Sequence, residues 1–355
     1  MNRWHVVLAA WALSLIAAFV VLSGIIPIQA SSGHWRATAW MLDLIKRRSV
    51  DFYAQSVEPP RLDQPSLIAR GAGHYERACR TCHGSPAADR PPLMMKMTPH
   101  PPFLPERVAR WTDAELFQIV KHGIKFTGMP SWPAPARNDE VWTMVAFLRQ
   151  LDGLSPEQYW RLAVGEPAHP GSSMPAIAVC AACHGVNGAG RDGGGFPVLA
   201  GQSASYMKRA LDAYAQGARY SGVMGPVAAA LDPEARDAVI AHYAALPPPA
   251  PRDAADKAAG AELALRGLPG QRIPACVECH RRSDRHPDYP RLDGQHAEYL
   301  WLQLQLFKSG ARGGSPLAEI MRPIAERLTV TQQQDVAAYF ASHLRADGAT
   351  VGKPQ

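Results

Sequence analysis

The chain has 355 residues, of which 47% are hydrophobic and 19% are charged, so it is long enough to bury two or three separate cores. Its formal net charge is +6, but the Lys and Arg residues are scattered singly and form no basic stripe, which argues against nucleic acid as a partner. Ala, Leu and Gln dominate the periodic segments and no run alternates Val, Ile and Thr, so we expect a mainly α fold.

The N-terminal stretch is apolar. Residues 6 to 28, VVLAAWALSLIAAFVVLSGIIPI, carry no charge and are long enough to span a bilayer. A cleaved signal peptide is the competing interpretation, but its apolar core is usually shorter, and Ile28 is a poor substitute for the small residue needed ahead of a cut after Ala30. We therefore expect a transmembrane anchor over residues 1 to 30, with the rest of the chain exported under either interpretation.

A basic juxtamembrane segment follows over residues 31 to 62. Arg3 is the only Lys or Arg before the span, whereas Arg36 and the basic residues of MLDLIKRRSV follow it, which reverses the usual positive-inside arrangement. We nevertheless keep the exported orientation and expect this basic stretch to lie at the headgroup surface as an amphipathic helix.

The cysteines carry the strongest signal. All six occur in three C-x-x-C-H motifs: Cys79, Cys82 and His83; Cys180, Cys183 and His184; Cys276, Cys279 and His280. In this signature two thiols attach covalently to a haem and the His is an axial iron ligand. A thioredoxin-like site would need a β-α-β pattern, and a small zinc module would need closer motifs. The motifs therefore predict three covalently bound c-type haems, with no cysteine left for a disulfide.

A methionine in an unusual setting follows the first motif. In TGMPSWP, residues 127 to 133, Met129 stands between Gly128 and Pro130, where neither a helix nor a strand is expected. A haem that carries electrons needs a second axial ligand, and thioether sulfur is the ligand that raises the potential. Met129 is therefore the predicted sixth ligand of the first haem, and Met94, Met95 and Met97 are its local competitors.

At this point the chain resembles the class I cytochromes c, in which an N-terminal helix runs into C-x-x-C-H, a Met loop follows, and a C-terminal helix crosses the first. Gly71, Tyr75 and Cys79 are spaced by four and share one helix face. The resemblance implies that this face packs against Trp142 or Phe147 of VWTMVAFLRQL.

A further helix is predicted between the Met competitors and the Met129 loop. In WTDAELFQIVKHG, Thr112 and Glu115 form a capping box, and Gly123 ends the helix.

The second and third motifs belong to an internal repeat. FPVLAGQSASYMKRALDAYAQGAR, residues 196 to 219, aligns with YPRLDGQHAEYLWLQLQLFKSGAR, residues 289 to 312. MGPVAAAL and MRPIAERL then align, which brings Met224 and Met321 into register as predicted axial ligands. These two repeats resemble the tandem di-haem cytochromes c of bacteria.

Two departures from that pattern stand out. Pro167, Pro170 and Pro175 precede the second motif and forbid a continuous helix there, so we expect this N-terminal helix to be lost or borrowed from another part of the chain. In the third repeat the predicted helix stops at Gly267, before the motif. His286 and His296 are alternative ligands for the third haem.

These features divide the chain as follows: anchor 1–30, juxtamembrane segment 31–62, first unit 63–163, second unit 164–248, third unit 249–346, and tail 347–355. The Pro-rich stretch 246 to 256 is the expected spacer between the second and third units. All three units are expected to be cytochrome c-like helical domains.

The resemblance implies an electron carrier without catalytic residues or a small-molecule substrate, anchored in the bacterial cytoplasmic membrane with its haem units in the periplasm. Redox proteins in or on the membrane are the expected partners: a quinol-oxidising complex or an exported dehydrogenase as donor, and a terminal oxidase or reductase of a respiratory chain as acceptor. Two alternatives stay open, a cytochrome subunit locked into a dehydrogenase complex, and a peroxidase-like or gas-binding protein with one open haem.

Overall fold

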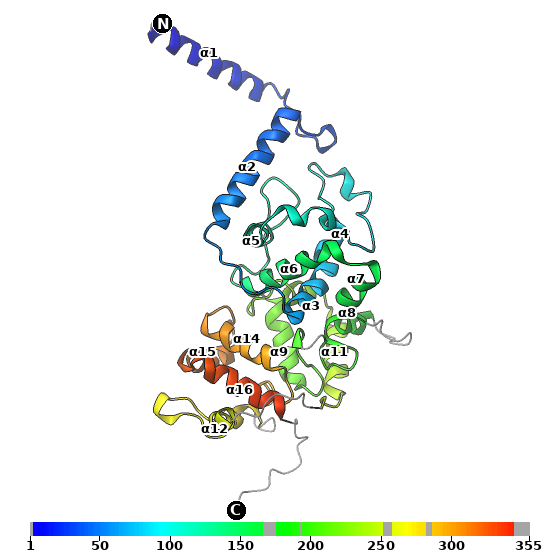
Figure 1. Cartoon of the computed structure of the whole chain (residues 1–355), viewed down its shortest axis with the longest axis vertical. Coiled ribbons are helices and arrows are strands. Elements are labelled where there is room, and N and C mark those ends of the chain that lie inside the picture. The colour runs from blue at the N-terminus through cyan, green and yellow to red at the C-terminus, as the bar shows by residue number, and fades with distance from the viewer. Residues whose placement is uncertain (1–2, 166–174, 192–193, 251–257, 282–285, 344–355) are drawn as a thin grey trace, which may run out of the picture.

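The computed structural model describes residues 3–165, 175–191, 194–250, 258–281 and 286–343. Within these ranges the regular structure is helical, with two isolated β-bridges and no strand, so the predicted mainly α fold is confirmed (Figure 1). The tail 347–355 and most of the two connecting stretches, including Pro167 and Pro170, lie outside the described residues.

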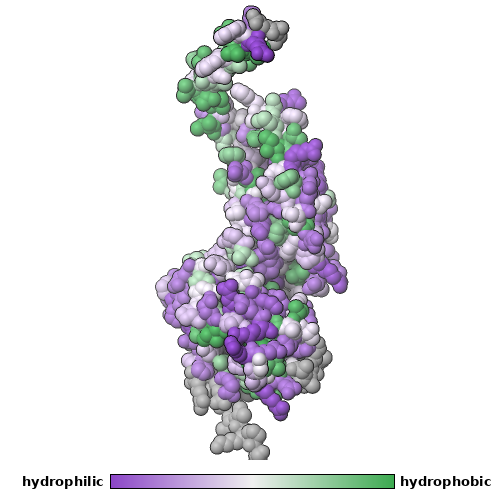
Figure 2. Space-filling view, turned by 90° about the vertical axis from the view of Figure 1, so that its left-hand side faces the viewer, coloured by the Kyte–Doolittle hydropathy of each residue, from purple (hydrophilic) through white to green (hydrophobic). Residues whose placement is uncertain are grey.

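Two long helices precede the haem-motif units (Figure 1). In α1 (Arg3–Leu22) no side chain is buried and the mean hydropathy reaches 2.4. This helix is long and apolar enough to span a membrane, although signal sequences have the same properties. Apolar residues gather over this end of the molecule in Figure 2. Helix α2 (Arg36–Ala54) packs against α5 (Asp113–His122), where Gln118 Nε2 donates a hydrogen bond to the Tyr53 carbonyl at 3.0 Å.

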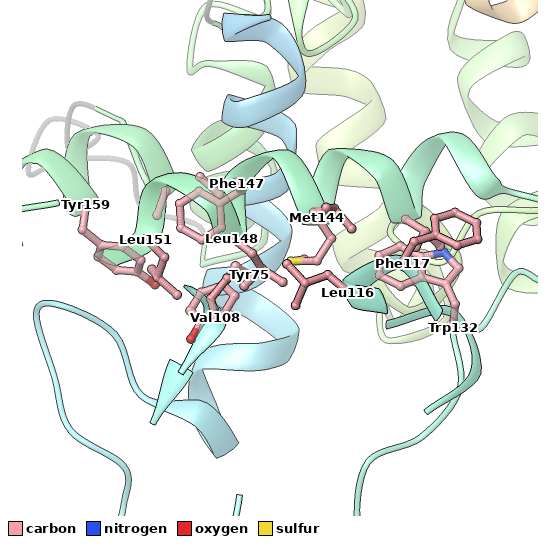
Figure 3. Packing of buried hydrophobic residues seen from close by; sticks show 14 of the residues in the cluster. Tyr75, Val108, Leu116, Phe117, Trp132, Met144, Phe147, Leu148, Leu151 and Tyr159 are labelled. Atoms are coloured by element: carbon pink, nitrogen blue, oxygen red, sulfur yellow. The ribbon is translucent and has the colours of Figure 1, made fainter. Parts of the chain in front are cut away.

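The first unit is built around one helix crossing. Its elements are α3 (Pro65–His74), a π-helical turn (Tyr75–Cys79), α4 (Arg80–His83), α5, α6 (Asn138–Gln150) and α7 (Pro156–Ala163). Where α3 crosses α6, a Cβ on Gly71 would overlap the Thr143 carbonyl and lie 2.6 Å from Phe147 Cβ, so only glycine allows this approach. The Tyr75 and Phe147 rings are 5.2 Å apart inside the core (Figure 3).

The predicted crossing is thus confirmed for Phe147. Trp142 instead stacks on Phe117 with ring centroids 4.3 Å apart. The predicted cap of α5 is also confirmed, since Thr112 and Glu115 form both hydrogen bonds of a capping box. Gly123 follows α5 with φ of 64°, a left-handed conformation that favours glycine.

The second unit has a shortened first helix. It consists of α8 (Pro175–His184), α9 (Ala204–Ala215), α10 (Met224–Ala229) and α11 (Pro233–Ala245). The expectation that this helix is lost or borrowed is wrong for the described residues, since a helix leads into the motif from Pro175, a position at which a missing N–H costs nothing. Helix α8 packs against α11, and Ile177 and Tyr243 are buried in their shared core.

The third unit repeats the crossing of the first with different residues. Its elements are α12 (Ala258–Arg266), α13 (Val277–His280), α14 (Ala297–Lys308), α15 (Pro316–Arg327) and α16 (Val330–Ser342). A Cβ on Gly260 of α12 would overlap the Asp335 carbonyl of α16 and lie 3.1 Å from Tyr339 Cβ. Gly267, with φ of 69°, ends α12 as predicted.

The second and third units join through reciprocal hydrogen bonds. The side chain of Gln295 accepts from Val198 N at 2.8 Å and donates to Val198 O at 3.0 Å. The side chain of Gln202 does the same to Arg291 N and O, at 2.9 and 3.0 Å. Because each glutamine is the Gln of the repeated Gly-Gln pair, the two units face one another with approximate two-fold symmetry.

Candidate functional site

Each motif histidine has one ring nitrogen next to the backbone carbonyl of a proline. The Nδ1 to O distances are 3.0 Å for His83 and Pro102, 3.1 Å for His184 and Pro197, and 2.8 Å for His280 and Pro290. A carbonyl only accepts hydrogen bonds, so Nδ1 carries the proton and the lone pair of Nε2 is left to bind a metal. The three imidazoles are therefore oriented alike, as axial iron ligands require.

These prolines were missed in the sequence, although a signal for them exists. Each is followed two positions later by leucine, in PFL at 102–104, PVL at 197–199 and PRL at 290–292. The repeat alignment matched the latter two prolines without assigning them a role. In the second and third units the next residue, Val198 or Arg291, is held by the glutamine of the opposite unit.

Burial favours the neutral form of the three motif histidines and of the first cysteine of each motif. It lowers the pKa of His83, His184 and His280, which favours the neutral imidazole that binds metals. Burial also raises the pKa of the Cys79 thiol to about 12, and that of Cys180 and of Cys276 to about 11. None of the six cysteines, all within the described residues, forms a disulfide.

A cavity of 1510 Å³ adjoins the first motif. Its walls include Cys79, Cys82, His83 and Met129, so the predicted fifth and sixth ligands of the first haem face one space. The volume exceeds the roughly 300 to 1,000 Å³ of most small-molecule pockets. The donor set of two thiols, an imidazole and a thioether matches what a c-type haem requires.

One competitor of Met129 reaches the same cavity. Met97 lines it, whereas Met94 and Met95 do not, and a Cβ on Gly128 would overlap the Met97 methyl group. His74 also lines the cavity; it is buried in α3 and was not noticed in the sequence.

The other two methionines lie on helices. Met224 is the first residue of α10, which packs against α9, and Met321 lies inside α15, two positions before Pro323. Their ligation of the second and third haems stays a prediction. Of the alternative histidines, His286 stacks on Tyr289, and the Nε2 of His296 lies 3.2 Å from the Ala189 carbonyl of the second unit, which places His296 in the contact between units.

The residue that follows each C-x-x-C-H motif differs between the third unit and the other two. Gly84 and Gly185 follow the first two histidines with φ of 71° and 76°, and their carbonyls accept hydrogen bonds from Tyr75 and Tyr243 at 2.7 and 3.1 Å. In the third unit Arg281 holds this place and pairs with Asp293 at 2.7 Å. The third motif is thus fixed by this ion pair and by a hydrogen bond from Arg281 Nη1 to Tyr339 Oη at 3.3 Å.

Two arginines, the buried Arg219 and the partly buried Arg312, meet where the second and third units touch. Arg219 Nη2 lies 3.3 Å from both Tyr299 Oη and Gln303 Oε1, and Arg312 Nη2 lies 3.4 Å from Tyr206 Oη. Among the ion pairs of the described residues, none involves either arginine. Burial and the charge of Arg219 lower the pKa of Arg312.

Such a pair of guanidinium groups is costly to bury without an anion. Burial alone would raise the pKa of the Tyr206 phenol, but the charges of Arg219 and Arg312 outweigh burial and lower this pKa to about 8. Haem carries two propionate carboxylates, and these arginines are suited to neutralise them.

Known families match two parts of the chain. Residues 66–148 match the family described as cytochrome c oxidase, cbb3-type, subunit III, and residues 173–246 match the family described as cytochrome c. A relative named thiosulfate dehydrogenase electron acceptor, from Stutzerimonas stutzeri (strain A1501), is 40% identical over 178 residues, which covers 48% of this chain and 82% of that protein.

Two further matches are to cytochromes c4. The protein from Azotobacter vinelandii is 32% identical over 174 residues, covering 45% of this chain and 81% of the relative. A solved structure of Acidithiobacillus ferrooxidans cytochrome c4 is 36% identical, covers 46% of this chain and 98% of its own, and has a TM-score of 0.41.

Proposed function

Since the chain belongs to the cytochrome c family, we propose that it is a membrane-anchored electron carrier with three haems, one in each unit. The observation that carries this proposal is the threefold recurrence of a motif histidine whose Nδ1 faces a proline carbonyl. A protein with one haem needs one such histidine and proline pair. Three pairs in one chain support a relay of three haems.

The residues of each unit divide the work of holding a haem. The two motif cysteines attach it, the motif histidine supplies the fifth ligand from Nε2, and the proline carbonyl keeps the imidazole in the correct tautomer. When bound, each haem supplies a one-electron couple at its iron. In the first unit the buried core of α3 and α6 holds the motif rigidly, which limits movement of the ligands between the two oxidation states.

The methionines determine whether small molecules can reach the iron. We assign Met129, Met224 and Met321 as the sixth ligands of the first, second and third haems. A position filled by thioether sulfur is closed to peroxide and gases, so the same residues that raise the potential also suppress catalysis. The shared cavity wall of His83 and Met129 supports the first of these assignments.

The N-terminal helices α1 and α2 indicate where in the cell the protein lies. We assign α1 as an uncleaved anchor in the cytoplasmic membrane and the three units to the periplasm, where covalent haem attachment takes place. The length, hydropathy and exposure of α1 support this assignment. Helix α2, which joins the anchor to the first unit, then lies near the membrane surface.

The partners follow from the chemistry and from the relatives. A dehydrogenase or a quinol-oxidising complex delivers electrons, and a terminal oxidase or reductase removes them. A second candidate is a dedicated subunit that accepts electrons from a thiosulfate dehydrogenase, which the name of the Stutzerimonas stutzeri relative favours.

Methionine variants test the proposed relay. Met129→Ala, Met224→Ala and Met321→Ala should each lower the potential of one haem and allow that haem alone to bind carbon monoxide when reduced. Met97→Ala is the matched control, because Met97 lines the same cavity as Met129. If Met97→Ala opens the first haem and Met129→Ala does not, Met97 is the ligand. If the parent protein already binds carbon monoxide, the relay gives way to the gas-binding alternative.

A further inference from the structure

A buried carboxylate of the first unit reaches into the second unit. Glu140, in the first turn of α6, is only 3% exposed. Its Oε1 accepts a hydrogen bond from Ser221 Oγ at 2.6 Å, and its Oε2 accepts one from Gly222 N at 2.7 Å. Two atoms of one short loop are therefore bound by a side chain that lies about eighty positions earlier in the sequence.

That loop leads directly into Met224. The Ser221 hydroxyl, while donating to Glu140, accepts from Met224 N at 2.9 Å and from Val223 N at 3.2 Å. The backbone N–H of the predicted sixth ligand is thus one hydrogen bond away from the group that binds Glu140. The position of the Met224 backbone determines where its sulfur lies. Glu140 therefore positions the Met224 sulfur through Ser221.

The same carboxylate also holds the Met129 loop. Trp132 Nε1 donates to Glu140 Oε2 at 3.1 Å, and Trp132 is buried at the end of the first core where Phe117 lies (Figure 3). The backbone N of Trp132 donates to Lys121 O at 2.9 Å, while Ile124 N donates to Met129 O at 3.2 Å. The segment with Met129 is therefore tied to the end of α5, and its far end is tied to Glu140.

Only a carboxylate satisfies this set of partners. Three hydrogen-bond donors converge on its two oxygens, and Arg137 Nη1 forms an ion pair with Oε1 at 3.1 Å. Arg137 Nη1 also donates to the Tyr220 carbonyl at 2.7 Å, one residue before Ser221. A glutamine would place an NH2 group against N–H donors on one side, which leaves buried groups unpaired.

We infer that Glu140 is a positioning residue that fixes the loops of two axial methionines at once, Met129 through Trp132 and Met224 through Ser221. This inference rests on the proposed function, because it needs both methionines as ligands. The first and second haems are then coupled through one side chain, while the third haem has no part in the arrangement.

Potentiometric titration of Glu140→Gln tests the inference in the full-length, haem-loaded protein. The potentials of two haems should shift while the third keeps its parent value, and reduced protein should gain carbon monoxide binding. Ser221→Ala should change one haem only, the one that Met224→Ala also changes. Trp132→Phe, which keeps the ring but loses the N–H, should change only the haem that responds to Met129→Ala.

Controls separate this effect from general damage. Glu157→Gln makes the same change of charge at an exposed carboxylate of the first unit and should leave all three potentials as in the parent. If Met224→Ala has no effect on any haem, the ligand assignment itself fails. If both methionine variants behave as proposed but Glu140→Gln leaves every potential and the carbon monoxide response unchanged, the inference about Glu140 is wrong and the proposed function stands.

Discussion

The two junctions between units are built from opposite charges. At the first junction, between the first and second units, the buried carboxylate of Glu140 accepts hydrogen bonds from Trp132, Ser221 and Gly222 and forms an ion pair with Arg137. At the second junction, between the second and third units, Arg219 and Arg312 lie close together with tyrosine and glutamine oxygens as partners.

The first junction is neutralised by protein groups alone, whereas the second has a charge that a ligand could neutralise. The charges of Glu140 and Asp139 are balanced by Arg137 and Arg70, so the first junction is complete within the chain. The second junction has an excess of positive charge, part of it buried, which two haem propionates would balance. We therefore expect the second junction to depend on haem more strongly than the first.

Removing one arginine should have the largest effect. Arg219→Met would leave a buried propionate uncompensated, which costs about 3 to 5 kcal/mol when a buried pair is broken. Loss of a nearby positive charge should also lower the potential of a haem in the second or third unit. Chemical unfolding and redox titration of the haem-loaded protein measure both effects.

Arg266→Met is the matched control, because the Arg266 side chain is 80% exposed and should contribute little. If Arg219→Met is as stable as the parent and all potentials are unchanged, the arginine pair does not bind propionates, and the contrast between the junctions is lost.

Acid should weaken the first junction through His74. This ring lies 4.8 Å from the Trp132 ring, and burial lowers the pKa of His74 to about 4. An unfolded histidine binds a proton near pH 6.5, so the stability contributed by neutral His74 is complete above that pH and is lost as the pH falls from 6.5 toward 4. The loss amounts to about 3 kcal/mol.

Unfolding curves at several pH values measure this loss in the parent and in His74→Phe. The variant should show a flatter pH profile between 6.5 and 4. An unchanged slope would mean that another group dominates acid unfolding.

A smaller effect is expected where the Met224 loop touches Trp132. A Cβ on Gly222 would lie 2.7 Å from Trp132 Cε2, so Gly222→Ala should destabilise the protein by about 1 to 3 kcal/mol through overpacking. Gly225→Ala is the control three positions later, since its Cβ would meet only the Tyr214 carbonyl at 3.7 Å. Equal melting temperatures for the two variants would show that the first junction is loosely packed.

Features that depend on residues close together in the sequence could be predicted from the sequence. Motif cysteines, the capping box of α5 and the Gly71 crossing all depend on residues a few positions apart or on one repeated helix face, and the structure confirms the latter two. The choice between Trp142 and Phe147 was open because both lie on α6, and packing against Tyr75 decided it.

The junctions could not be predicted in the same way. The contact between Glu140 and Ser221 joins residues without any shared pattern, and a carboxylate in a first helical turn usually indicates only a favourable helix dipole. Sequence alone did not predict α8, because a proline that ends a helix in one place begins one in another, as Pro175 does here. The alignment of the repeats did reveal Gln202 and Gln295, but not that each binds the opposite unit.

A reductive titration that counts electrons taken up per chain tests the central claim most directly. The protein is extracted from membranes in detergent, oxidised fully, and titrated anaerobically while the haem absorption is followed. Three electrons per chain, with no absorption change when carbon monoxide is then added, is the result that a relay of three closed haems predicts. Fewer than three electrons, or a carbon monoxide complex in the parent protein, would contradict it.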